Sequence, residues 1–121
     1  MKKAIRCSLW LWLILFLAAA VVCSPAIAQT VVATVAVGSA PVVAGVNPTT
    51  NHMYVANGLS GNVSVIDGTT NQVVATVAVG TWPYGVGVNP TTNRIYVANF
   101  VSNNVSVIDG TTNQVVATVA V

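Results

Sequence analysis

The stretch NVSVIDGTTNQVVATVAV at Asn62–Val79 returns unchanged at Asn104–Val121. Aligning residues 31–72 with 73–114 extends this identity to a period of 42 residues without a gap. Ten of the 42 aligned positions differ, and a third copy begins at residue 115. A period of this length is typical of repeat architectures, in which each repeat is one structural unit that packs against its neighbours.

Each repeat contains four short runs rich in β-branched residues. In the second copy they are Tyr84–Val88, Arg94–Asn99, Asn104–Asp109 and Gln114–Val121. Val, Ile, Thr and Tyr favour strands, whereas the Asn-Pro and Asp-Gly pairs between the runs favour turns. No stretch after the N-terminal segment shows a helical period. We therefore expect each repeat to form a four-stranded antiparallel meander.

The fourth strand, VVATVAV at Val73–Val79, places apolar or small residues on both of its faces. A sheet with one solvated face would alternate apolar and polar residues, so both faces of this sheet are expected to be covered. Four strands in about forty residues, stacked on like neighbours, describe a β-propeller blade. The predicted fold is all-β: blades at 38–79 and 80–121, and an extra outer strand within 29–37, an incomplete propeller.

Several pieces of the repeat resemble the YVTN-type β-propeller repeats of secreted and surface-layer-like proteins. They are Val63–Asp67, Val73–Val79, Pro83 before an apolar strand, and the signatures Tyr54–Asn57 and Tyr96–Asn99. Both signatures read YVAN, with Ala in place of the Thr that names the family. The resemblance implies a propeller, usually seven-bladed, with relatives that include lactonases and haem-bearing reductases. It implies little about the activity of this chain.

The N-terminal segment has the three parts of a secretory signal. Three basic residues precede an apolar run, Cys7–Cys23, and the small residues Ala26 and Ala28 form an A-x-A site. We expect residues 1–28 to be a signal helix that is cleaved after Ala28, which places the mature protein in the periplasm, outside the cell or on its surface. An uncleaved membrane anchor and a lipid attached to Cys23 are the alternatives.

Cleavage would remove both cysteines and three of the four basic residues. Tyrosines aside, the titratable side chains that remain are His52, Asp67, Arg94 and Asp109, which give one positive against two negative charges. Without a basic stripe, nucleic-acid binding is not expected. Converging acids, bases or metal ligands are also missing, so we expect no enzyme activity, no metal and no cofactor. The His52 to Arg94 exchange between copies indicates a tolerant, solvent-facing position.

Eight of the ten differences fall on two connections of the repeat. These are the connection into the first strand, including its start, and the connection between the second and third strands, which share one rim of a propeller. Exposed aromatic residues on rigidly held loops are good contact residues. The hypothesis is a binding rim made of Trp82, Tyr84, Phe100 and Asn103. The alternative is that these rings pack between blades.

Two blades are fewer than the four to eight of a closed propeller and would expose broad apolar faces. We expect an exported, non-catalytic propeller module for protein or ligand interaction, or for cell-envelope structure. Its partner would be itself, three copies giving six blades or four giving eight, or another envelope or extracellular protein. No membrane contact is expected after cleavage. The alternative is a truncated fragment of a longer propeller, for example a lactonase-like one, whose functional residues are missing.

Overall fold

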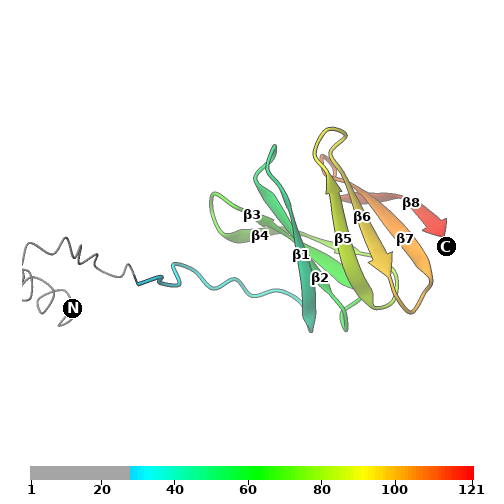
Figure 1. Ribbon diagram of the computed structural model, residues 1–121, viewed down its shortest axis with the longest axis horizontal. Helices are drawn as coiled ribbons and strands as arrows, with labels where there is room; N and C mark the ends of the chain where they lie inside the picture. Colours follow the sequence, from blue (N-terminus) through cyan, green and yellow to red (C-terminus); the bar gives the residue numbers. More distant parts are fainter. Residues whose placement is uncertain (1–27) are drawn as a thin grey trace, which may run out of the picture. The chain divides into compact units, whose positions relative to one another are not determined.

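The computed structural model describes residues 28–121, and these form strands and turns with no helix (Figure 1). The predicted signal helix lies outside the described residues. Among those described, no helix has the length and apolar character needed to cross a membrane. The strands are β1 (Pro41–Asn47), β2 (His52–Asn57), β3 (Asn62–Asp67), β4 (Gln72–Ala78), β5 (Pro83–Asn89), β6 (Arg94–Asn99), β7 (Asn104–Asp109) and β8 (Gln114–Ala120).

The strands form two four-stranded antiparallel sheets, in the order β1-β2-β3-β4 and β5-β6-β7-β8. Each sheet is a meander, because the strands within a sheet pair in the order of the sequence. We call β1–β4 blade 1 and β5–β8 blade 2. The first strand of each blade carries a β-bulge, between Pro41 and Val43 in β1 and between Pro83 and Gly85 in β5. The prediction of two propeller blades with four strands each is confirmed.

The predicted extra outer strand at Val31–Val37 carries no strand assignment within this chain, and its pairing with a blade of another chain stays a prediction. The physical reason is that both fourth-strand positions are already occupied. β4 pairs with β3 in blade 1, and β8 pairs with β7 in blade 2. The sequence pattern of the segment suits a strand, but within this chain β3 and β7 already have an outer partner.

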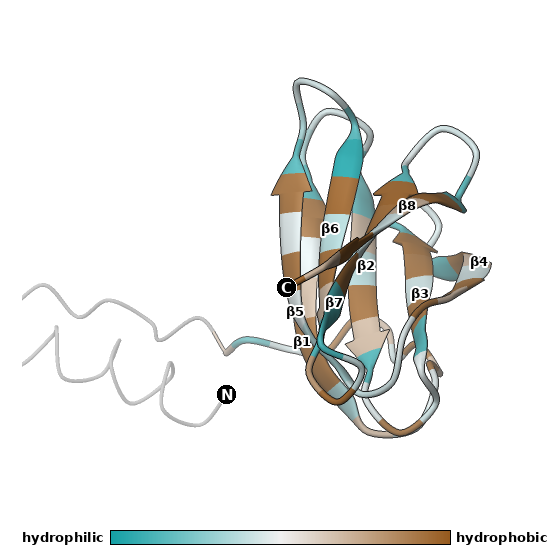
Figure 2. Cartoon of the chain, turned by 90° about the vertical axis from the view of Figure 1, so that its right-hand side faces the viewer, coloured by the Kyte–Doolittle hydropathy of each residue, from teal (hydrophilic) through white to brown (hydrophobic). Residues whose placement is uncertain are grey.

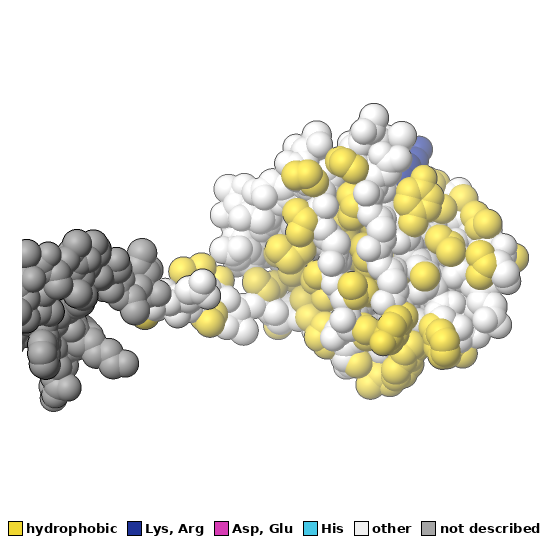
Figure 3. All heavy atoms as spheres, viewed as in Figure 1, with side chains coloured by type: hydrophobic (Ala, Val, Ile, Leu, Met, Phe, Trp, Pro, Cys, Tyr) yellow, Lys and Arg dark blue, Asp and Glu magenta, His cyan; other side chains and the backbone are white. Residues whose placement is uncertain are grey.

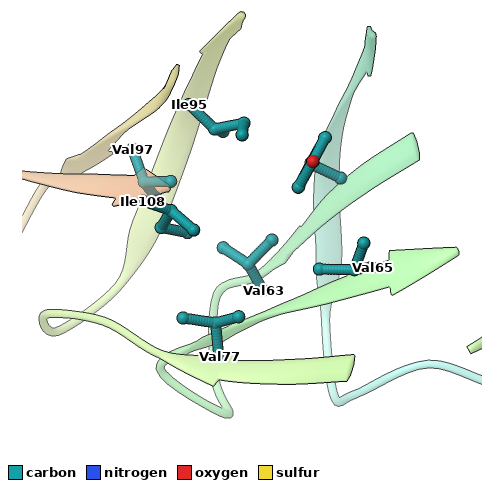
Figure 4. Packing of buried hydrophobic residues seen from close by; sticks show 7 residues of the cluster. Val63, Val65, Val77, Ile95, Val97 and Ile108 are labelled. Carbon is teal, nitrogen blue, oxygen red and sulfur yellow. The ribbon is translucent and has the colours of Figure 1, made fainter. Parts of the chain in front are cut away.

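The core lies between the two blades, where β1 and β2 pack against β5. Figure 4 shows side chains from both sheets pointing toward one another in this layer. Fully burying an aliphatic or aromatic side chain of this size contributes about 1.5–3 kcal/mol. Seven buried residues form the cluster: Tyr54, Val63, Val65 and Val77 from blade 1, and Ile95, Val97 and Ile108 from blade 2.

Apolar side chains also remain on the surface. In Figure 2 the strands of blade 2 carry bands of hydrophobic residues along their length. The space-filling view in Figure 3 shows hydrophobic and uncharged groups over most of the visible face, with a basic side chain only at one edge. Patches of this kind in soluble proteins mark interaction surfaces.

Candidate binding rim

Two loops of blade 2 form one end of the blade, and hydrogen bonds join them. The backbone N–H of Phe100 donates to the carbonyl of Trp82 at 2.9 Å. The N–H of Thr81 donates to Ser102 Oγ, also at 2.9 Å. The β4–β5 and β6–β7 loops therefore lie side by side, as expected for loops of the same rim. This pairing brings the two loops that differ most between the repeats next to each other.

Two aromatic side chains lie together on this rim. The ring centroids of Tyr84 and Phe100 are 6.4 Å apart, and the rings are tilted by 48°. This separation lies in the range of about 4.5–7 Å that is favourable for aromatic pairs. Both rings stay open to solvent, with Tyr84 59% and Phe100 71% exposed. They line a mainly apolar hollow of about 330 Å³, to which Asn103 and Val121 also contribute.

Asn103 has a structural role besides its place at the hollow. Its φ of 52° lies in the left-handed region, and Gly61, its counterpart in blade 1, has φ 63°. Gly and Asn are the residues that adopt this conformation most readily. The carbonyl of Asn103 also accepts a hydrogen bond from the N–H of Val121 at 3.2 Å. The exchange between the repeats is thus one that the turn geometry allows.

Trp82 does not line this hollow with the other three predicted residues, although its carbonyl accepts a hydrogen bond from the Phe100 N–H. Its side chain is half-buried, and a Cβ added to Gly58 of blade 1 would lie 3.6 Å from Trp82 Cε2 and 3.0 Å from Val42 Cγ2. The indole therefore lies next to blade 1, and the small residue at position 58 leaves room for it. Trp82 also has a positive φ of 56°, a conformation that costs about 1–3 kcal/mol for a non-glycine residue.

A buried polar layer lies beneath the aromatic pair. The side-chain amide of Asn99 donates to Asn104 Oδ1 at 2.8 Å and to Ser106 Oγ at 2.9 Å. Asn99 is 2% exposed and borders the hollow, and its Oδ1 has no hydrogen-bond partner within the chain. Asn57 repeats this arrangement in blade 1, including the unpaired Oδ1. The layer is therefore a property of the blade, and in blade 2 Asn99 and Asn104 line the same hollow as Tyr84 and Phe100.

The charged residues lie along the hairpins, where their cross-strand partners are in register. Arg94 is opposite Asp109 and forms a salt bridge with it, while His52 is opposite Asp67. Hydrogen bonding from Arg94, followed by that from the N–H of Thr111, lowers the pKa of the Asp109 carboxyl. The first cause of the lowered pKa of Asp67 is the backbone N–H of Thr69.

From the sequence, the His52 to Arg94 exchange indicates only a tolerant, solvent-facing position. The structure shows that each faces an aspartate across its hairpin, and that the Arg94 side chain is 35% exposed. The signal that could have revealed this is the strand register, because the turn between strands fixes which residues are opposite. Within residues 28–121, no three His, Cys, Asp or Glu side chains gather in a way that could hold a metal ion.

No protein-family profile and no curated protein sequence matches the chain. Solved structures do match it. Hydrazine synthase from Kuenenia stuttgartiensis shares 26% identity over 77% of this chain, with a TM-score of 0.65. AztD from Citrobacter koseri shares 21% over 72%, with a TM-score of 0.63. The β-propeller domain of Cps50 (Swd1) from Myceliophteria thermophila shares 11% over 71%, with a TM-score of 0.62.

These similarities support the β-propeller fold of the two blades. They cover 27%, 25% and 26% of the matched chains, so this chain spans about a quarter of their length. The resemblance to YVTN-type repeats in particular stays a prediction.

Proposed function

We propose that this chain is an exported β-propeller module that binds a protein partner through the rim of blade 2, without catalysis. The observation that carries the proposal is the exposed pair of Tyr84 and Phe100 over the polar layer of Asn99. Aromatic side chains with adjacent amides are typical of protein contact sites, because the rings supply buried area and the amides supply hydrogen bonds.

The lining of the hollow favours an uncharged segment of the partner. Every residue that lines it is apolar, aromatic, glycine or asparagine. A charged group placed there would lose hydration without gaining a partner of opposite charge. Asn103 lines the hollow and is exposed, so its side-chain amide can form hydrogen bonds with the bound segment, whereas the unpaired Oδ1 of Asn99 is buried.

The few charged side chains of blades 1 and 2 lie opposite one another in pairs, which supports the non-catalytic part of the proposal. Arg94 and Asp109 bind one another, and His52 faces Asp67 in the other hairpin. The four side chains lie at strand ends next to the β1–β2, β3–β4, β5–β6 and β7–β8 turns, whereas the aromatic pair lies at the β4–β5 and β6–β7 loops. The proposed site therefore combines no acid or base with the aromatic pair.

Export is supported by the sequence of the N-terminal segment. A chain produced in a bacterial host is expected in the periplasm or the medium, and N-terminal sequencing should begin at Gln29. A product that starts at Met1 in the cell membrane would contradict cleavage and favour the anchor.

The binding site can be tested with a display library of peptides selected on the immobilised chain. The variant that lacks the site carries Tyr84→Val and Phe100→Gly, which gives blade 2 the residues that blade 1 has at these positions. Enriched peptides should be mostly uncharged and bind the variant at least tenfold more weakly, a loss of about 1.4 kcal/mol. Circular dichroism checks that the variant is folded. Peptides that bind both proteins equally would refute the site.

A second candidate is a segment of a longer propeller. The observation that favours it is the open apolar face of blade 2, where Tyr96 is 42% exposed although its counterpart Tyr54 is fully buried. In that case further blades of the same polypeptide would cover this face. Sequencing the gene beyond the codon of Val121 tests this candidate, since repeats that continue in frame, or after one frameshift, would support it.

A further inference from the structure

The two blades have nearly the same sequence but differ in which face is buried. Tyr54 is completely buried, whereas Tyr96 at the equivalent position is 42% exposed. Likewise Val77 is 6% exposed and Val119 is 51% exposed. The exposure of identical side chains differs because blade 2 covers this face of blade 1. Nothing in the described residues covers the same face of blade 2. We call this surface of Gly87, Tyr96, Ala98 and Val119 the open face of blade 2.

The space above the central glycine of the first strand is filled in blade 1 and open in blade 2. A Cβ added to Gly45 would lie 2.7 Å from Val86 Cγ1 and 3.1 Å from Val88 Cγ2, so side chains of β5 occupy the space above this glycine. A Cβ added to Gly87, the equivalent residue, would meet nothing within 4 Å. The space above Gly87 is therefore free to take an aliphatic side chain of another blade, as the space above Gly45 takes those of Val86 and Val88.

The opposite side of blade 1 carries the matching surface. Four of the blade 2 residues that pack on blade 1 or belong to the core between the blades lie on the first two strands of blade 2: Val86, Val88, Ile95 and Val97. Val46, the counterpart of Val88, is 54% exposed, and Ala44, the counterpart of Val86, is also exposed. The open face of blade 1 thus consists of four apolar counterparts: Ala44, Val46, Met53 and Val55.

Where two blades meet, a large residue of one repeat lies against a small residue of the other. Within the chain, the large Trp82 lies near the small Gly58, with Val42 beside it. If blade 1 of a second copy packed on blade 2, Ala40 of that copy would take the place that Trp82 has within one chain. It would then lie next to Phe100 and Tyr84, the counterparts of Gly58 and Val42. A large side chain would again face a small one. The aromatic residues of blade 2 therefore suit a neighbour that begins with blade 1.

The connection into blade 1 already has the geometry of a connection between blades. Ala40 has φ 53° and Trp82 has φ 56°. The N–H of Gly58 donates to the carbonyl of Ala40 at 2.8 Å, as the N–H of Phe100 does to Trp82 at 2.9 Å. Before this connection, Val31–Val37 has the same seven residues as Val73–Val79 and no strand assignment. The same seven residues return at Val115–Val121, and all but the last belong to β8. The outer strand beside a connection between two blades therefore has the same sequence in every copy of the repeat.

We propose that a second copy of this chain docks the open face of its blade 1 on the open face of blade 2, head to tail. The proposal names the partner for the rim of the proposed function and rests on that function. A head-to-tail contact is heterologous, because different surfaces meet, and it closes into a ring or extends according to the angle between copies. This contact would cover the exposed apolar area of both faces. It would repeat the contact that blade 1 and blade 2 make within one chain.

Site-directed cross-linking tests the proposal with the full chain in a Cys7→Ser, Cys23→Ser background. The Cβ position of Gly45 lies 3.5 Å from Val86 Cβ, which is at the lower end of the range of about 3.5–4.5 Å found in disulfides. Gly45→Cys with Val86→Cys in one chain is therefore the positive control for closure within the chain. The equivalent pair between two copies is Gly87→Cys in one chain and Ala44→Cys in the other.

Mixing the two single-cysteine chains under mild oxidation should give a covalent dimer on a non-reducing gel. We expect at least tenfold less dimer when Thr111→Cys, on an exposed turn, replaces Gly87→Cys. Absence of the mixed dimer while the positive control closes would overturn the proposal. A Gly87→Cys dimer that forms equally well without the Ala44→Cys chain would also overturn it, because like faces would then meet. If cross-linking fails but selected peptides still need Tyr84 and Phe100, only the identity of the partner is wrong.

Discussion

Val86 on β5 occupies the space above Gly45 on β1, where a Cβ would come within 2.7 Å of Val86 Cγ1. This contact joins the first strands of the two blades, and it explains why β1 has a glycine at the centre of a strand. Glycine in a strand often marks a site where another part of the chain approaches closely. The repeat preserves the same residue at Gly87, where that neighbour is missing from the described residues.

Gly45→Ala is expected to lower the free energy of unfolding by about 1–3 kcal/mol, because the added methyl group overpacks the layer between the blades. Gly87→Ala is the matched control, since a Cβ there meets nothing within 4 Å. Ala favours a strand more than Gly does by the same amount in both variants. The difference between their free energies of unfolding therefore reports the contact of the added methyl group with Val86 and Val88. Urea unfolding at low protein concentration measures both. Equal stability of the two variants would contradict the packing.

Tyr54→Phe is expected to raise the free energy of unfolding by up to about 1 kcal/mol, because the buried Tyr54 hydroxyl has no hydrogen-bond partner within the chain. Burial, followed by the charge of Asp109, raises the pKa of this hydroxyl in the folded state. Above the ordinary tyrosine pKa of 10.0 the unfolded chain therefore loses its proton first, and stability falls as pH rises.

The Tyr54→Phe chain should lack the part of the alkaline decline that comes from Tyr54. The matched control is Tyr96→Phe, which removes a hydroxyl from a ring that is 42% exposed and leaves Tyr54 in place. Thermal unfolding between neutral pH and pH values above 10 compares the three chains. An alkaline decline of the same size in Tyr54→Phe and the unsubstituted chain would show that this group is not responsible.

Arg94→Gln is expected to destabilise the chain at neutral pH more than at strongly acidic pH. The folded-state pKa of Asp109 lies below its ordinary value of 3.8, first because Arg94 donates a hydrogen bond to it. A depressed pKa stabilises the fold above that ordinary value, and the contribution is lost as pH falls through the folded-state pKa. Urea unfolding at neutral pH and near pH 2 should show the difference between variant and parent shrinking.

His52→Gln serves as the comparison in blade 1. Backbone N–H groups of Thr69 and Thr70 contribute more to the lowered pKa of Asp67 than the charge of His52 does. The acid dependence should therefore change less in His52→Gln than in Arg94→Gln. If both substitutions shift the acid unfolding curve equally, the salt bridge of Arg94 has no special role.

Asn103→Gly is expected to change the free energy of unfolding by less than about 0.5 kcal/mol, whereas Asn103→Val should lower it by about 1–2 kcal/mol. The reason is the φ of 52° at Asn103, which glycine adopts freely, as Gly61 does at the equivalent position. A β-branched residue is strained in this conformation. Chemical denaturation measures both, and a Val variant as stable as the Gly variant would contradict the turn geometry.

The strands could be predicted closely from the sequence. Arg94–Asn99 and Asn104–Asp109 form β6 and β7 with the predicted bounds, because β-branched runs end at turn residues that cannot continue a strand. The segment Val31–Val37 carries no strand assignment within the chain. Its residues suit a strand as well as those of β8 do, but a strand also needs an unoccupied neighbour.

The candidate site was predicted less completely. Tyr84, Phe100 and Asn103 line one hollow, as expected for residues on a common rim. Trp82 lies on the same loop system, yet its ring lies beside Gly58 of the other blade. Which way a side chain turns at a loop depends on the space left by residues far away in the sequence.

The sequence by itself determined the repeat, the four strands of each blade and the sites where the copies diverge, because local strand and turn preferences and a 42-residue identity are written directly in it. Only the tertiary structure decided the exposure of equivalent residues. Tyr54 and Tyr96 have the same local sequence, but blade 2 covers the first and leaves the second open. Burial depends on what packs against a residue, and that neighbour comes from another part of the chain or from another molecule.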